Sequence, residues 1–245
     1  MSSEGGRALR ALVLQHEEPT PPGHVTEWLQ GHGARIEVFR LDLDDREIDP
    51  RDHDLIVSLG SEFAAYDDSH EFVPREARLM RRAVDAGVPV LGLCFGGQML
   101  ARVLGGEVFR GPDAEIGWLP VRTTDPQLVP EGPWFQWHFD VITAPPGSTV
   151  VAETDLGTQA FVAGRSLGLQ FHPEVTPEIM DEWVRAYRHE LDAEGVDPDA
   201  LLEETNRGAR DHKRTSWKLL ERFFDRIAGL GPRAAASEGR RGALR

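Results

Sequence analysis

The sequence predicts an α/β protein in which a mostly parallel sheet is flanked by helices, followed by mixed or antiparallel strands and a helical C-terminal extension. Two observations carry this prediction. In the first hundred residues, short apolar runs typical of buried strands alternate with amphipathic segments typical of helices, and glycine or proline marks most boundaries. Between about 107 and 171, short strand-like pieces follow one another without helical segments between them.

Apolar runs and helical spacing define the elements of the first half. The segments typical of buried strands are 7–14, 34–41, 54–60 and 88–93. The segments typical of helices end in glycine, and they are 23–33, 74–87 and 95–106. In the second of these helices we expect the buried stripe to consist of Ala77, Met80 and Val84, because they recur at helical spacing.

In the second half of the sequence we expect two further helices, and the whole sequence divides into a main domain, an extension and a tail. A helix over 176–191 begins with a threonine cap followed by proline, and another over 217–227 carries an apolar stripe suited to core packing. We expect the main domain to span 1–191, with a helical extension over 192–230. The small, polar and arginine-rich residues 231–245 predict a disordered tail.

Composition excludes several classes of function. The 245 residues carry a formal net charge of −14, which disfavours binding to nucleic acid or to anionic membranes, since phosphates attract basic surfaces. No apolar run approaches the roughly 20 residues of a membrane-spanning helix. One cysteine rules out an internal disulfide. We therefore expect a cytoplasmic protein with neither a nucleic-acid nor a membrane partner.

The single cysteine, Cys94, lies at a sharp bend between a predicted strand and a predicted helix. The sequence Gly-Leu-Cys-Phe-Gly over 92–96 has the G-x-nucleophile-x-G form of a nucleophile elbow. Its glycines permit close backbone approach, and the helix N-terminus favours a thiolate. A lone cysteine is often only a buried packing residue. The elbow context favours a nucleophile instead.

A nucleophilic cysteine needs a base, and the base needs a partner that orients it. His172 follows an apolar strand, and Glu174 lies two residues later, so that in extended chain both side chains face the same side. His138 also lies in a strand-like context. We expect the remaining histidines to lie at the surface, and they are His16, His24, His32, His53, His70, His189 and His212.

Taken together, these residues resemble the class I glutamine amidotransferase family with its Cys-His-Glu triad, here Cys94, His172 and Glu174, and within it the free-standing GMP-synthase-like branch. The resemblance runs from about 50 to 185, and its stretches are "PVLGLCFGGQMLARVLGGEV", "AEIGWLPV", "WFQWHFDVITAPPGSTVVAETD" and "LGLQFHPEV". It implies a flavodoxin-like α/β fold. It also implies hydrolysis of the glutamine side-chain amide through a cysteine thioester.

The resemblance assigns further roles. The backbone N–H groups of Gly60 and Phe95 are expected to form the oxyanion hole. Gln98 is expected to help seat the substrate. The family's other glutamine contacts map onto Trp137, His138, Phe139 and Asp140.

Two positions depart from the family pattern. The oxyanion strand, which usually ends Gly-Gly-Pro, reads Leu-Gly-Ser-Glu over 59–62 and keeps the glycine at Gly60. The usual His-Gly-Asp reads His-Phe-Asp here, so that Phe139 replaces a glycine. We favour a core position for the Phe139 ring; a ring in the pocket would alter which γ-glutamyl compound fits. The tryptophans expected to serve packing are Trp118, Trp134 and Trp137.

Three hypotheses about function follow. The first is a glutaminase that passes ammonia to a separate synthetase. The second is a stand-alone γ-glutamyl hydrolase or peptidase. The third is a non-catalytic interaction module, which the intact triad disfavours. The sequence contains no G-x-x-x-x-G-K-[ST] loop and no metal-ligand cluster of credible spacing, so we expect neither a cofactor nor a metal.

Overall fold

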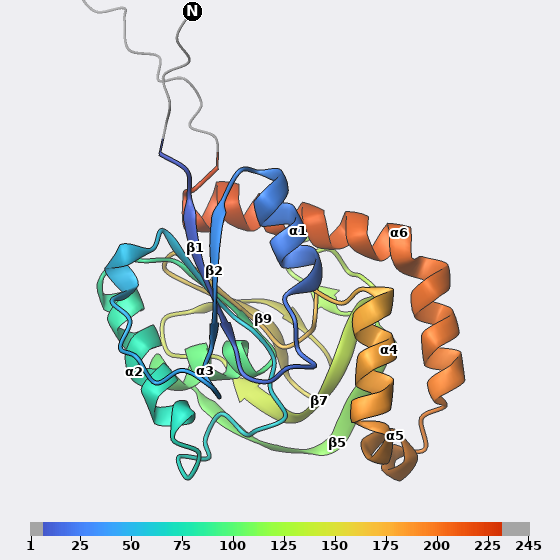
Figure 1. The fold of residues 1–245 in the computed structure, drawn as a ribbon. Helices are drawn as coiled ribbons and strands as arrows, with labels where there is room; N and C mark the ends of the chain where they lie inside the picture. The colour runs from blue at the N-terminus through green and yellow to red at the C-terminus, as the bar shows by residue number, and fades with distance from the viewer. Residues whose placement is uncertain (1–6, 232–245) are drawn as a thin grey trace, which may run out of the picture.

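The centre of the fold is an eight-stranded sheet, seen in a computed structural model that describes residues 7–231 (Figure 1). Its strands are β1 (Arg10–Gln15), β2 (Arg35–Arg40), β3 (Leu55–Ser58), β4 (Val90–Leu93), β6 (Arg122–Thr123), β8 (Thr149–Glu153), β9 (Thr158–Ala163) and β10 (Ser166–Leu169). The order is β2-β1-β3-β4-β10-β9-β8-β6. The first five strands are parallel, and the rest pair antiparallel. This confirms the predicted fold class.

Within residues 7–231, six α-helices pack around the sheet. They are α1 (Gly23–Gly31), α2 (Phe72–Asp85), α3 (Phe95–Val103), α4 (Pro177–Ala186), α5 (Arg188–Glu194) and α6 (Pro198–Arg222). Alternate side chains of each strand point to opposite faces. In β1, Ala11 and Val13 pack with α1 and α6, whereas Leu12 and Leu14 pack with α2 and α3. Both faces of the sheet are therefore covered, as a parallel sheet requires.

A separate antiparallel ribbon lies beside the main sheet. It consists of β5 (Glu107–Leu119) and β7 (Trp134–Thr143), with a register shift between Arg110 and Glu115. The His172 N–H donates to the Phe135 carbonyl at 2.9 Å, which ties β7 to the segment after β10. A third apolar cluster joins this ribbon to α4 and α5, with Trp118, Phe135 and Trp183 buried in it. The ribbon thereby forms one wall next to the carboxyl ends of the parallel strands.

Two predicted helices have different bounds in the structure. The helix expected over 176–191 breaks at Tyr187, whose φ of −110° and ψ of 26° are not helical, and continues as α5. The segment 217–227 covers the end of the longer α6 and most of the π-helical turn that follows it over Phe223–Ala228. The Asp197 carboxylate caps α6 by accepting from the N–H of Asp199 at 2.9 Å. Helix α6 thus begins well before residue 217, within the segment 192–230 that the sequence predicts to be helical.

The buried side of α2 also differs from the prediction. Of the expected stripe, only Met80 is buried; the inward positions are Val73, Glu76, Leu79, Met80 and Ala83. The shift occurs because the Glu76 carboxylate is buried against His16. The surface prediction is therefore wrong for His16, and it is also wrong for His24, which is 5% exposed.

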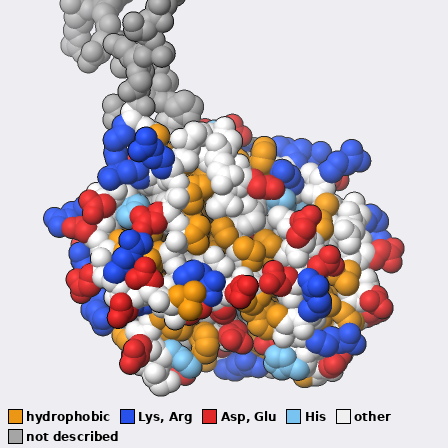
Figure 2. Space-filling view, viewed as in Figure 1, with side chains coloured by type: hydrophobic (Ala, Val, Ile, Leu, Met, Phe, Trp, Pro, Cys, Tyr) orange, Lys and Arg blue, Asp and Glu red, His pale blue; other side chains and the backbone are white. Residues whose placement is uncertain are grey.

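The C-terminal part of the described chain packs on the rest. Helix α6 contacts α1 and α4. The division into a domain over 1–191 and an extension over 192–230 stays a prediction, and the tail predicted to be disordered lies, apart from Gly231, outside the described residues. No helix within 7–231 is long and apolar enough to span a membrane. Acidic and basic side chains are interspersed over the face drawn in Figure 2.

Close packing of α3 on the sheet leads to a stability prediction. A β-carbon on Gly97 would lie within 3.0 Å of the Leu169 carbonyl oxygen in the core strand β10. We expect Gly97→Ala to lower the free energy of unfolding by about 1–3 kcal/mol, since overpacking forces backbone shifts. A β-carbon on Gly31 in α1 meets nothing within 4 Å, so Gly31→Ala should not destabilise the protein. Urea denaturation of both variants tests this, and equal loss in both would contradict it.

Candidate active site

The parallel strands end at one edge of the sheet, and the candidate site lies there. Cys94 occupies the single residue between β4 and α3, with φ of 48° and ψ of −105°. It is the one non-glycine residue with positive φ in the described chain. Such a backbone costs about 1–3 kcal/mol and persists only where the surroundings enforce it. The Cys94 N–H donates to the Leu169 carbonyl at 2.8 Å, which supplies part of that enforcement.

The glycines around Cys94 make the bend possible. A β-carbon on Gly92 would lie within 3.0 Å of the Gly96 backbone, and one on Gly96 would collide with Ser58. The strand and the helix can therefore approach only because these positions lack side chains. The predicted strand–cysteine–helix elbow is present, and Cys94 is 6% exposed at the pocket.

The predicted base and its partner are in contact. His172 Nδ1 lies 2.7 Å from Glu174 Oε1, and both side chains are buried. Because a carboxylate accepts, Nδ1 donates and Nε2 is left for the thiol. His172 Nε2 is buried and has no hydrogen-bond partner among residues 7–231. The edge of the His172 ring lies against Trp183 at 4.8 Å between centroids, so packing also fixes the ring.

The charge state of His172 follows from these neighbours. Burial alone would lower its pKa, but the charge of Glu174, the charge of Cys94 and the hydrogen bond to Glu174 raise the pKa to about 10. The imidazole therefore holds a proton at neutral pH. This state supplies a general acid next to the sulfur atom.

Two backbone donors face the same space. The N–H groups of Gly60 and Phe95 have no acceptor among the described residues. A β-carbon on Gly60 would lie 2.9 Å from His172 Cε1 and 3.8 Å from Cys94 Cβ, so Gly60 lies directly beside both side chains. Phe95 is the first residue of α3, where N–H groups point out of the helix. These positions match the expected oxyanion hole.

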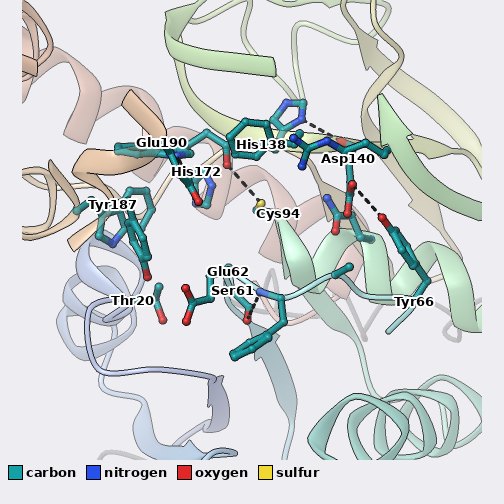
Figure 3. A pocket seen from close by; sticks show the side chains of 18 residues that line it. Thr20, Ser61, Glu62, Tyr66, Cys94, His138, Asp140, His172, Tyr187 and Glu190 are labelled. Carbon is teal, nitrogen blue, oxygen red and sulfur yellow. Dashed lines mark hydrogen bonds between the residues drawn. The ribbon is translucent and has the colours of Figure 1, made fainter. Parts of the chain in front are cut away.

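The expected substrate contacts divide into two groups (Figure 3). Gln98, Trp137, Phe139 and Asp140 line the pocket. His138 also borders it, but its ring points away from Cys94. The reason is that His138 Nδ1 bonds the Asp140 carbonyl at 3.0 Å, while Nε2 lies 3.1 Å from both Gln136 Oε1 and Glu115 Oε2. A direct substrate contact by the His138 imidazole is not supported by this geometry.

Phe139 also differs from the favoured expectation. Its ring is half-buried, packs against the third apolar cluster and still lines the pocket. The Arg110 guanidinium lies over it, 4.2 Å from the ring centroid. The expected packing role holds for the tryptophans, all of which are buried: Trp118, Trp134 and Trp137.

Sequence reasoning missed several residues of the pocket. Tyr66 donates to the Asp140 carboxylate at 3.3 Å, and Glu190 accepts from the Trp137 indole at 2.7 Å. Gln170 links Gln98 to the thiol: its oxygen accepts from Gln98 at 3.3 Å, and its nitrogen lies 3.6 Å from the sulfur. Other missed lining residues are Thr20, Arg110, Trp183 and Tyr187. Gln170 lies in the quoted stretch "LGLQFHPEV", whereas the others come from segments distant in sequence that no local motif marks.

One carboxylate of the pocket has a shifted titration. Burial raises the pKa of Asp140, partly offset by the Tyr66 hydrogen bond and by the charge of Arg110. Arg110 and Asp140 are paired in register across β5 and β7. A cation and an anion therefore lie together at one side of the pocket, a pattern that suits a zwitterionic amino-acid head group.

An α/β sheet that carries a cysteine on such an elbow, next to a buried imidazole and two outward amide donors, defines the class of enzymes that attack acyl carbons with a thiol. Within that class, a family model described as "Glutamine amidotransferase class-I" matches residues 25–186. The chain belongs to the class I glutamine amidotransferases.

Individual relatives agree with this family. A glutamine-hydrolyzing GMP synthase of Thermus thermophilus is 39% identical over 163 residues, which cover 61% of this chain and 32% of that protein. The chain thus spans about a third of the length of this curated relative. A glutamine amidotransferase structure from Thermotoga maritima is 32% identical with a TM-score of 0.82, covering 89% of this chain and 99% of that one. A glutamine amidotransferase structure from Methylobacillus flagellatus is 26% identical with a TM-score of 0.81, covering 89% and 95%.

The His172–Glu174 contact predicts a specific change with pH. The proton on His172 is lost as pH rises through its pKa, so the alkaline limb of kcat/KM should lie near pH 10. In Glu174→Gln the attraction of a negative charge is lost, which lowers the pKa of His172 and moves this limb to lower pH. In Glu174→Gln we also expect the fall in kcat to be larger than the rise in KM. This fall in kcat should be smaller than the fall in His172→Ala. A pH profile that is identical in wild type and Glu174→Gln would show that another group orients the imidazole.

Proposed function

We propose that this protein hydrolyses the side-chain amide of L-glutamine through a thioester on Cys94. The observation that carries the proposal is the convergence of a strained cysteine, the His172–Glu174 pair and two unpaired backbone N–H groups on one pocket. Each component corresponds to one need of acyl transfer: a nucleophile, an acid and base, and a site for the oxyanion.

In the first half of the reaction, the Cys94 thiolate attacks the γ-carbonyl carbon of glutamine. The carbonyl oxygen gains negative charge and accepts hydrogen bonds from the N–H groups of Gly60 and Phe95. The proton on His172 passes to the leaving nitrogen, the carbon–nitrogen bond breaks and ammonia departs. The product on the enzyme is a γ-glutamyl thioester.

In the second half, neutral His172 accepts a proton from water as the water oxygen attacks the thioester carbon. The carbon–sulfur bond breaks, glutamate leaves and the Cys94–His172 pair returns to its starting state. Glu174 stabilises the imidazolium that forms in this step.

Pocket polarity supports an amino-acid ligand, since Arg110 suits the α-carboxylate and Asp140 suits the α-ammonium group.

We further propose that the ammonia passes to a separate synthetase. The support is that the GMP synthase relatives are much longer than the region that this chain matches. An ammonia donor of this kind should have weak glutaminase activity alone and higher activity when a partner is bound. The nature of the ammonia acceptor would then be set by that partner.

Covalent labelling tests the proposed nucleophile. A glutamine analogue with an electrophilic carbon at the position of the amide should add one label to wild type, and mass spectrometry should place it on Cys94. We expect Cys94→Ala to take no label and to lose glutamine turnover, while its unfolding transition remains cooperative. Labelling of Cys94→Ala at another residue would move the chemistry away from the elbow.

A second candidate function is favoured by Phe139, whose ring borders the pocket under Arg110. A ring at this place suits a γ-glutamyl amide or conjugate with a larger leaving group than ammonia. In that case the protein would be a stand-alone γ-glutamyl hydrolase with full activity in the absence of a partner.

Phe139→Gly separates the two candidates. For an ammonia donor, kcat/KM on free glutamine should stay the same or rise. For a γ-glutamyl hydrolase, kcat/KM on the bulkier substrate should fall by an amount equivalent to about 1–3 kcal/mol of transition-state binding. Steady-state kinetics on glutamine and on a panel of γ-glutamyl amides measure both, with Phe139→Ala as a control for glycine flexibility. If kcat/KM for both kinds of substrate is unchanged in Phe139→Gly, the ring of Phe139 serves packing alone.

A further inference from the structure

A second buried histidine–glutamate pair lies behind the pocket, and none of the chemical steps above uses it. His16 follows β1, and Glu76 lies on α2. Their side chains are both 0% exposed, with His16 Nε2 2.8 Å from Glu76 Oε2. The Ser58 hydroxyl donates to the other carboxylate oxygen at 2.5 Å. Burial of an ion pair without a role is costly, because desolvation offsets much of its attraction.

His16 touches both residues that supply the oxyanion hole. Its Nδ1 lies 2.9 Å from the carbonyl oxygen of Gly60. Its ring packs on the ring of Phe95, with 4.6 Å between centroids. Since Gly60 and Phe95 come from different strand ends, the imidazole connects the two halves of the hole.

Hydrogen-bonding rules fix the protons of this pair. A carbonyl oxygen only accepts, so Nδ1 of His16 must carry a proton. Nε2 faces a carboxylate that already accepts from Ser58, which favours donation here as well. Burial alone would lower the pKa of His16, but Glu76 raises it above the ordinary value through charge and a hydrogen bond. With a partner at each nitrogen, the ring has one stable orientation.

The loop needs an external restraint because its own sequence supplies little. Residues 59–62 read Leu-Gly-Ser-Glu, with no proline, and Gly60 has wide backbone freedom. The peptide before Gly60 is fixed, since the Leu59 carbonyl accepts from the Gly96 N–H at 3.0 Å. The peptide after Gly60 is fixed by His16. The Leu59 bond sets the direction of the Gly60 N–H, because both groups lie in one peptide plane, and the His16 bond restrains rotation of the Gly60 backbone from the other side.

Glu17, which follows His16 in the sequence, restrains the other end of the loop 59–62. The Glu17 carboxylate accepts from the Ser61 hydroxyl at 3.0 Å and from the Glu62 N–H at 2.7 Å. The segment after β1 therefore holds the loop at three successive residues. This continuity indicates that the segment shapes the loop as a unit.

We propose that His16, anchored by Glu76, is a positioning residue that holds the Gly60 carbonyl and thereby keeps Gly60 in the conformation in which its N–H meets the developing oxyanion. The proposal rests on the proposed hydrolysis at Cys94. It predicts that loss of the pair weakens binding of the transition state while binding of the substrate is unchanged.

Two variants test the pair at different strengths. Glu76→Gln keeps the shape and an acceptor for Ser58 but removes the charge that anchors His16. His16→Leu/Glu76→Gln also removes the bond to Gly60, without leaving a buried charge unpaired. The matched control is Glu37→Gln, which breaks a histidine–glutamate contact of 3.1 Å with His53 at the opposite end of β3.

The measurements are kcat and KM for glutamine, the inhibition constant of an aldehyde analogue of glutamine, and the rate of Cys94 alkylation by iodoacetamide. The aldehyde forms a hemithioacetal whose oxygen occupies the oxyanion hole, whereas alkylation creates no oxyanion. We expect kcat to fall about 3- to 10-fold in Glu76→Gln and about 10- to 100-fold in the double variant, approaching the effect of losing one oxyanion donor. Aldehyde affinity should fall by the same factors, while KM and the alkylation rate stay at wild-type values. In the Glu37→Gln control, all four quantities should stay at wild-type values.

Each other outcome has a defined meaning. Unchanged kcat and aldehyde affinity in folded Glu76→Gln or in the double variant overturn the proposal. A parallel loss of alkylation rate overturns it too, because it indicates general damage to the elbow. If the double variant fails to unfold cooperatively, the isosteric Glu76→Gln decides alone. A wild-type protein without glutamine turnover would instead overturn the proposed function, and this is measured first.

Discussion

The elbow at Cys94 depends on the close approach of β3, β4, β10 and α3, and the rest of the site depends on the elbow. Three glycines at positions 92, 96 and 97 allow this approach, since a β-carbon at any of them would collide with a neighbouring backbone. The strain at Cys94 is held by a hydrogen bond to Leu169 and by the bond between Gly96 and Leu59. Both bonds also determine the positions of His172, three residues beyond the end of β10, and of Gly60.

The dry surroundings of the site give its charges their strength. The His172 ring packs against Trp183 and Phe135, and Glu174 is buried beside it. Where water is excluded, a carboxylate influences an imidazole more strongly than at the surface, and for this reason the pKa of His172 rises despite its burial. The ribbon of β5 and β7 forms the wall of the site that carries Phe135. It thus serves both to exclude water and to place Arg110 and Asp140 at the pocket.

The two histidine–glutamate pairs use the same interaction for different purposes. In the pair of His172 and Glu174, one ring nitrogen is left for the thiol. In the pair of His16 and Glu76, both ring nitrogens have partners, so that no nitrogen is available for proton transfer. An imidazole with a vacant nitrogen can react, whereas one with two fixed partners can only hold its neighbours. This difference separates chemistry from positioning.

The sequence by itself determined the alternating α/β order, the bend at Cys94 and the spacing of His172 and Glu174, because these depend on neighbouring residues and on local periodicity. Tertiary structure decided the rest. Glu76 is not part of the stripe that helical spacing predicts, yet it is buried, since its partner His16 lies 60 positions away. The His138 ring turned from the pocket because Glu115, on the paired strand, attracts it. Tyr66, Arg110 and Glu190 reach the pocket from separate elements. Contacts between distant segments form only when the chain folds, and a local pattern does not encode them.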